Sequence, residues 1–231
     1  MVRKLKSALK FLFVRGILTR PVKWMITVGL TFVMLAAEFL WMVPQGEEDF
    51  LLSKMMFNYV IQLTPIIIMI LLNSETAGNR AIRAFPCAKA LYTRAMPVFS
   101  GIISCGTTAV FMLLYAAGVF IMGESPVQIS EMLVATAPMM AFYSLIGGIA
   151  PLFRYGMLMM IYLPMMLNFI PLLFPISEDI LVNGTGLPMW TAALIFIGAA
   201  AASVLISCAA GSIIYKHASF RPIVMNTIVA K

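Results

Sequence analysis

Long apolar stretches with almost no charge constrain this sequence more than any other feature. A helix needs about 20 apolar residues to cross the hydrocarbon core of a bilayer. Such stretches occur at residues 23–43, 55–73, 97–122, 131–151, 155–175 and 188–215. Hydrophobic residues make up 62% of the chain and charged residues 11%, whereas soluble domains carry about 25% charged residues. The sequence therefore predicts an all-α integral membrane protein with six transmembrane helices, because a barrel would show short alternating segments instead.

The charged residues predict the orientation of these helices. With the N-terminus inside the cell, every Lys and Arg except Lys54 falls on the cytosolic side, as the positive-inside rule requires. The acidic residues of the outer loops are Glu47, Glu48, Asp49, Glu124, Glu178 and Asp179. We therefore expect both termini in the cytosol. The net charge of +7 is interpreted as a topology signal, and no nucleic-acid partner is expected.

The chain is expected to divide into three regions. Residues 1–22 are rich in Lys and Arg, and Leu5, Leu9 and Leu12 recur among them at roughly helical spacing. This pattern predicts an amphipathic helix at the cytosolic interface rather than a cleaved signal peptide. A basic flank that only fixes orientation is the alternative. The other two regions are a six-helix transmembrane domain and a cytosolic tail, at residues 23–216 and 217–231.

Prolines predict an irregular fifth span. Pro164, Pro171 and Pro175 each remove a backbone donor and can kink a helix. We therefore expect a bent or broken outer half, such as a re-entrant turn, before a loop at residues 177–186. Ordinary packing against lipid is the alternative.

The fourth and sixth spans carry signals for a helix start and for close packing. Ser130 is expected to cap the fourth span. Gly147 and Gly148 in the fourth span let helices approach closely. The same holds for two runs of small residues in the sixth span, 198–203 and 208–212. We expect the sixth span to pack tightly, within the subunit or at a dimer contact.

The longest polar interruption lies at residues 73–97, between the second and third spans. Its basic residues are Arg80, Arg83, Lys89 and Arg94. Pro86 suits the first turn of a helix, and Pro97 marks the start of the next span. Apolar residues at helical spacing form one face: Ala88, Leu91, Tyr92 and Ala95. The residues away from that face are Lys89, Thr93 and Arg94. We expect a short amphipathic helix; one that simply lies among lipid headgroups is the alternative.

The sequence has no constellation typical of an enzyme, and the chain itself is not expected to be one. His217 is the only histidine, which argues against His-based metal sites and catalytic triads. A phosphate-binding loop of the G-x-x-x-x-G-K-[ST] kind does not occur. Cys87, Cys105 and Cys208 have no paired spacing and are expected to be packing residues. No metal or cofactor is expected in this chain.

Polar residues within the spans are candidates for a translocation path. An ionisable residue inside a span is a functional hypothesis by default, and Glu38 lies in the first span, shallow enough to reach outer water. The candidate path residues are Glu38, Asn58, Gln62, Thr107 and Asn168. Such groups could equally bond across helices.

The layout resembles the permease subunit of an ABC-2-type ABC transporter, a class whose ATPase is a separate polypeptide. The resemblance covers the basic leading helix, the six spans and the long loop between the second and third spans. There the family has an acidic residue, a basic segment, Leu-Pro and a short helix. This chain has Glu75, Arg80-Ala-Ile-Arg83, Phe85-Pro86 and Cys87 to Ala95. It departs from the pattern at Phe85, where leucine is usual, and at Cys87-Ala88, where a serine-arginine type of pair is usual.

The resemblance implies that residues 82–95 contain a coupling helix, which docks on the nucleotide-binding subunit. The coupling residues it implies are Glu75, Arg80, Arg83, Phe85, Pro86, Lys89, Leu91, Tyr92 and Arg94. ATP and Mg would bind to the partner ATPase. A second copy or a sister permease would complete the pathway in the lipids of a bacterial plasma membrane. On this reading, Leu91→Glu or Tyr92→Glu uncouples ATP turnover from transport and leaves the membrane fold intact.

Few charges lie in the spans, which favours an amphipathic peptide, a drug-like or a lipid-like substrate, and the resemblance implies that this substrate is exported. Three other classes stay open. The first is the substrate-binding membrane subunit of an energy-coupling vitamin importer. The second is a membrane-embedded enzyme such as an intramembrane protease. The third is a non-transporting membrane scaffold or immunity protein.

Overall fold

The computed structural model describes a set of helical segments separated by gaps. The described residues are 2–14, 86–121, 123, 125–153 and 169–217, together with residues 25, 26, 29, 33, 58, 61, 68 and 82. Within these ranges the regular elements are all helices and no strand occurs. The predicted all-α class is thus confirmed for the described part of the chain.

Helices account for nearly all of the described ranges. In chain order they are α1 (Val2–Phe13), α5 (Ala88–Ala90), the π-helical turn η2 (Leu91–Ala95), α6 (Met96–Ile121), α7 (Val127–Ile149), the 3-10 turn η3 (Ala150–Leu152), α9 (Phe169–Asn183) and α10 (Met189–His217). Three continuous helices are long and apolar enough to cross a membrane: Ala88–Ile121, Val127–Leu152 and Met189–His217. They correspond to the predicted third, fourth and sixth spans. Most residues of the predicted first, second and fifth spans lie outside the described residues.

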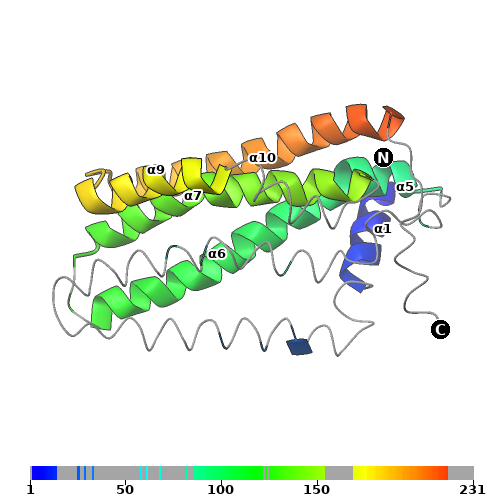
Figure 1. Ribbon diagram of the computed structural model, residues 1–231. Helices are drawn as coiled ribbons and strands as arrows, with labels where there is room; N and C mark the ends of the chain where they lie inside the picture. The colour runs from blue at the N-terminus through cyan, green and yellow to red at the C-terminus, as the bar shows by residue number, and fades with distance from the viewer. Residues whose placement is uncertain are drawn as a thin grey trace, which may run out of the picture.

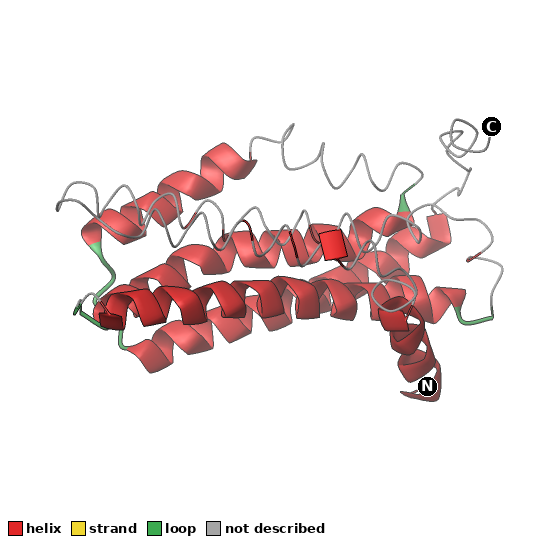
Figure 2. Ribbon diagram, turned by 90° about the horizontal axis from the view of Figure 1, so that it is seen from below, coloured by secondary structure: helices red, strands yellow, loops and turns green. Residues whose placement is uncertain are grey.

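Helices α6, α7 and α10 run side by side, with α9 along one end of α7 and α1 crossing the opposite end of the bundle steeply (Figures 1 and 2). Helix α7 is the central element among these three. In its most apolar 18-residue stretch 67% is buried, against 39% for the helix that contains α6 and 22% for α10. Among these three helices, exposed apolar side chains therefore lie mainly on α6 and α10, and they include Leu113, Phe120, Leu205 and Ile213.

Serine side chains from three helices donate hydrogen bonds to carbonyl oxygens of α7. The pairs are Ser100 Oγ to Ser144 O at 2.7 Å, Ser177 Oγ to Ala135 O at 2.7 Å and Ser207 Oγ to Leu145 O at 3.4 Å. The donors come from α6, α9 and α10 in turn. Hydrogen bonds between helices in a membrane contribute roughly 0.6 kcal/mol each on average, so these bonds orient the helices more than they hold them together.

Removing the hydroxyl that joins α9 to α7 is expected to loosen α9 without unfolding the bundle. Ser177 is fully buried, and Ser177→Ala should cost about 0.5–1.5 kcal/mol. The matched control is Ser212→Ala, because the exposed Ser212 hydroxyl donates only to the Cys208 carbonyl of its own helix, at 2.8 Å. Reversible unfolding in a denaturing detergent titration measures both. Equal losses in the two variants would contradict a specific contact between α9 and α7.

Small residues allow α6, α7 and α10 to approach one another closely. A Cβ added at Gly148 of α7 would lie 2.9 Å from Pro97 Cα of α6 and would overlap the Ser207 hydroxyl of α10. The predicted role of Gly148 in helix packing is therefore confirmed. On α10, Ser203, Ser207 and Gly211 are buried at four-residue spacing. The run at 198–203 packs only at its end, since a Cβ at Gly198 would meet nothing within 4 Å.

Two predicted helix boundaries are wrong. The fourth span starts at Val127, preceded by Pro126, so Ser130 is not a cap but donates from within the first turns to the Val127 carbonyl, at 2.7 Å. Residues 177–183, predicted as part of a loop, belong to α9, which continues through Pro175. Pro164, where a break was also predicted, lies outside the described residues. Burial of Ser177 and Leu181 against α7 favours the helix over the loop.

Glycine ends α9 in a way that the sequence signals. Gly184 has a φ of +70°, a conformation that glycine adopts at low cost. Its N–H donates to the Ile180 carbonyl at 3.0 Å, which is the bond expected of a left-handed helix cap. The connection to α10 is therefore short, at residues 184–188.

The described charged residues separate to opposite ends of the bundle. Basic residues lie at the end formed by α1, η2 and the last turn of α10, and they include Lys6, Lys10, Lys89, Arg94 and Lys216. The described acidic residues Glu131, Glu178 and Asp179 lie at the other end, near the start of α7 and the end of α9. The bundle thus has a basic end and an acidic end.

Candidate functional site

The segment 86–97 at the basic end leads directly into the membrane-length helix. Pro86 and Cys87 form a turn in which Pro86 is exposed and Cys87 is half-buried, and the Leu91 N–H donates to the Cys87 carbonyl at 2.8 Å. From Ala88 the helix continues to Ile121 over 34 residues. The sequence predicted a separate short helix before Pro97, and this prediction is wrong, because no break separates the segment from α6.

A π-helical turn explains how the helix passes Pro97. The Met96 N–H donates to the Leu91 carbonyl, five residues back. Pro97 has no N–H, and in a regular α-helix its ring would clash with the carbonyl four residues earlier. The wider π turn, a common device for absorbing such a defect, carries the helix past the proline.

The π turn also changes which side chains of this segment are buried. Ala88, Leu91, Tyr92 and Ala95 are buried, as their spacing predicted. Thr93 was expected on the polar side, but it is only 3% exposed. A turn of five-residue bonds rotates successive side chains less than an α turn does, so Thr93 moves toward α10. Its Cα lies 3.6 Å from the position of a Cβ at Gly211.

Helix α1 covers one side of this segment. Ala8 and Leu12 of α1 are buried in one apolar cluster with Leu91 and Tyr92, and Leu5 and Leu9 pack against that cluster. Lys6 and Lys10 lie on the exposed side of α1. The amphipathic helix predicted within residues 1–22 is therefore present, and its apolar face contacts protein.

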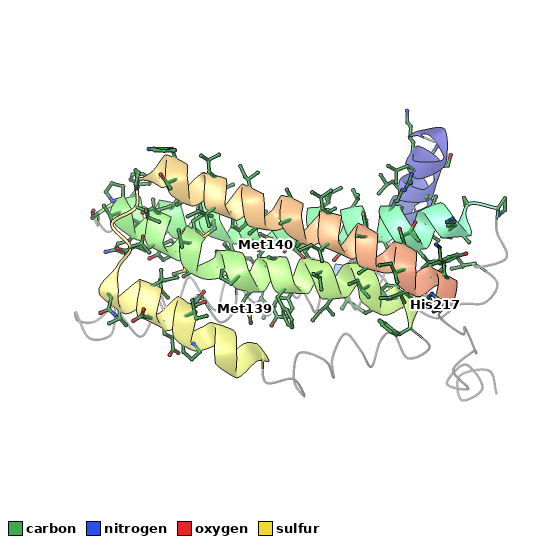
Figure 3. The ribbon with its side chains drawn as sticks, turned by 90° about the horizontal axis from the view of Figure 1, so that it is seen from above. Met139, Met140 and His217 are labelled. Carbon is green, nitrogen blue, oxygen red and sulfur yellow. The ribbon has the colours of Figure 1, made fainter. Side chains whose placement is uncertain are left out.

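Helix α10 covers the other side. The rings of Tyr92 and Tyr215 are 6.3 Å apart between centroids, within the range of favourable aromatic pairs. Figure 3 shows His217 at the end of α10, at the same end of the bundle as α1. The segment Ala88–Ala95 is thus held between α1 and the last turns of α10.

The structure places the predicted coupling residues in different environments. Pro86 and Lys89 are exposed, and Arg94 is half-buried. Leu91 is 1% exposed and Tyr92 0%, so their side chains pack within this chain. Their implied role as coupling residues stays a prediction. Glu75, Arg80, Arg83 and Phe85 lie outside the described residues.

Of the predicted path residues, the structure describes Asn58 and Thr107. Asn58 is buried. Thr107 is half-buried, and its hydroxyl donates to the Ile103 and Ser104 carbonyls of its own helix, at 2.7 and 3.1 Å, which gives it a local role. Glu38, Gln62 and Asn168 lie outside the described residues.

The sequence does not distinguish three other buried polar residues from ordinary packing residues. Thr108 Oγ1, Tyr143 OH and Ser144 Oγ are buried and have no hydrogen-bond partner in the described part of the chain. Ser144 and Tyr143 lie in a span whose sequence is uniformly apolar and small, so neither residue stands out. They contribute polar character to the interior between α6 and α7.

The described ranges offer no cluster for metal binding or nucleophilic chemistry. No group of three or more His, Cys, Asp or Glu side chains occurs within them. The three cysteines are free, and Cys105 Sγ lies 3.6 Å from Met140 Sδ as an interhelical packing contact.

Comparison with protein-family models, with curated proteins and with solved structures gives no match. Function is therefore inferred from the layout of the sequence and from the geometry of the basic end.

Proposed function

We propose that this chain is the transmembrane permease subunit of an ATP-driven ABC-2-type exporter. In this proposal it is a multi-pass protein of a bacterial plasma membrane, with six spans and both termini in the cytosol. A separate ABC ATPase subunit binds ATP and Mg and docks at the basic end. Two permease copies, or this chain and a sister permease, form the path for an amphipathic peptide, drug-like or lipid-like substrate.

The distribution of charge supports this orientation. Basic residues at one end and acidic residues at the other match the positive-inside rule if the basic end faces the cytosol. Ile61 and Ile68, from the predicted second span, add a second argument. Ile61 is buried with the acidic-end residues Val119 and Ile129, whereas Ile68 is buried with Leu12 of α1. Ile61 thus lies toward the acidic end and Ile68 toward the basic end, which is the order expected of an inward second span.

The continuity of the helix Ala88–Ile121 carries the mechanism. Lys89 in its first turn and Pro86 just before it are exposed, while the next residues are held between α1 and α10. Because no loop separates this surface turn from the membrane-length helix, displacement by a partner moves α6 directly. Conformational work requires the partner to bind two states of the permease with different affinity, and ATP binding to the partner provides that difference.

Purification from the native host in mild detergent, followed by mass spectrometry, tests the proposal. We expect a soluble ABC ATPase to co-purify, with an ATP turnover rate that changes when this chain is present. A protein that purifies alone and does not alter ATP turnover would favour a scaffold or immunity protein. A tightly held small molecule in place of an ATPase would favour a vitamin importer subunit.

Charge reversal at Lys89 is the point mutation best suited to test docking. Lys89 is exposed and lies in the first turn of the helix Ala88–Ile121. Lys89→Glu should leave the fold intact, because surface substitutions usually change stability by no more than about 0.5 kcal/mol. It should weaken ATPase capture by about tenfold, which corresponds to about 1.4 kcal/mol. Lys10→Glu, at an exposed lysine of α1, is the matched control. Unchanged capture in Lys89→Glu would remove this turn from the docking surface.

A further inference from the structure

An edge of α10 combines an apolar strip with cationic groups at the basic end of the bundle. Leu205, Ala209, Ser212 and Lys216 follow one another at intervals of four, three and four residues, so they lie on one side of the helix. All four are exposed. The strip is apolar in its deeper part and becomes polar and then charged toward the end of the helix.

Arg94 adds a second cation beside this strip. It follows Thr93, whose Cα lies 3.6 Å from the position of a Cβ at Gly211 of α10, so Arg94 belongs to the turn that packs against the last turns of α10. Arg94 is half-buried, as expected of a side chain whose stem packs on apolar surface while its head reaches water. The last turn of α10 also places Lys216 beside Tyr215, whose ring lies next to Tyr92.

No acidic residue of the described ranges lies at this end to neutralise the two cations. All three described acidic residues, Glu131, Glu178 and Asp179, belong to the opposite end. A ligand that satisfies the whole edge must therefore carry a negative charge at one end and a long apolar part below it. That is the chemistry of an anionic phospholipid at the water boundary of a bilayer.

We propose that this edge binds an anionic phospholipid of the leaflet at the basic end. The headgroup phosphate lies between Arg94 and Lys216, and an acyl chain lies along Leu205 and Ala209. The bound lipid neutralises these two cations at the end of the bundle where α1 and α10 hold the segment Ala88–Ala95. It thereby stabilises the packing of that segment. This inference rests on the membrane placement proposed above but not on the ATPase partner.

The test uses the full-length protein in nanodiscs of phosphatidylcholine, to which phosphatidylglycerol with the same acyl chains is added. Bound lipid is counted by native mass spectrometry, and thermal stability is followed in parallel. Cations near a membrane surface each strengthen binding about fivefold, so Arg94→Gln with Lys216→Gln should weaken phosphatidylglycerol binding about 25-fold. Lys216→Gln alone, at an exposed position that does not threaten the fold, should weaken it about fivefold.

Matched variants and ligands distinguish a specific lipid site from diffuse charge attraction, from binding of free phosphate and from docking of a protein. Lys6→Gln with Lys10→Gln removes the same charge from α1 and should change lipid binding less than about twofold; an equal loss would mean diffuse attraction and overturn the site. Equal binding of phosphatidylcholine, or displacement of the lipid by inorganic phosphate, would also overturn it. ATPase capture is measured on the same variants. Loss of capture with normal lipid binding would make the edge a protein-docking surface instead.

Discussion

Replacing Gly148 by leucine is expected to prevent α6, α7 and α10 from packing together. A Cβ at this position would lie 2.9 Å from Pro97 Cα and 3.3 Å from Pro97 Cβ, and would overlap the Ser207 hydroxyl. The neighbour on α6 is backbone, so no rotamer change relieves the contact. Inserting atoms into a packed interior costs about 1–3 kcal/mol and occasionally more. For a leucine wedged between three helices we expect more than about 3 kcal/mol.

The consequence is measured as the yield of monodisperse protein in mild detergent and the midpoint of unfolding in a denaturing detergent. Gly148→Ala should give an intermediate loss, because the extra methyl meets the same backbone but adds fewer atoms. Gly198→Leu is the matched control, since that glycine lies on α10 in open surroundings, and its loss should stay below about 0.5 kcal/mol. If Gly148→Leu were as stable as Gly198→Leu, the three-helix contact would be wrong.

The membrane-length helices could be predicted because length and hydrophobicity decide them. Predicted spans at 97–122 and 188–215 correspond to α6 at Met96–Ile121 and α10 at Met189–His217. Their boundaries agree because a helix in lipid must satisfy its backbone internally along its whole apolar length. The start of α7 was missed by four residues, 131 against Val127, because Ser130 carries the residue type of a cap but the chain turns earlier, at Pro126.

The irregular parts of the site could not be predicted from periodicity. A period of 3.6 residues assumes bonds four residues apart, and it correctly grouped Leu91 with Tyr92. It misplaced Thr93, because the missing donor of Pro97 and the close approach of Gly211 favour a π turn. In the sequence each cause is a single residue, Pro97 or Gly211. Its effect depends on which helices pack together in the fold.

A single sequence also does not show whether lipid or protein contacts the apolar face of a helix. The spacing of Leu5, Leu9 and Leu12 predicted an amphipathic helix, and lipid was the natural contact for its apolar side. In the structure that side packs on Leu91 and Tyr92. The same contact removes these two residues from the surface that a partner could reach, which changes the design of any test of coupling.

Tyr92→Glu is therefore expected to disrupt the fold rather than to uncouple it. Tyr92 is 0% exposed and packs on α1 and on the ring of Tyr215. The substitution removes a large aromatic side chain, which costs about 3–5 kcal/mol for comparable truncations, and it places a carboxyl group in an apolar cluster, which costs more whether or not the group is ionised. We expect the loss of stability to exceed about 4 kcal/mol, and the yield of folded protein to fall sharply.

Comparison of Tyr92→Glu with Lys89→Glu separates folding from docking, because both place a carboxylate in the same turn region and only Tyr92 is buried. Unfolding midpoints and ATPase capture are measured on both. Lys89→Glu should remain folded and lose capture, whereas Tyr92→Glu should lose its fold, and Tyr92→Phe should keep it because the ring packing is retained. A folded, monodisperse Tyr92→Glu protein would place the tyrosine on a free surface. The packing of the segment Ala88–Ala95 between α1 and α10 would then be wrong. Direct contact of Tyr92 with a partner would be the better interpretation.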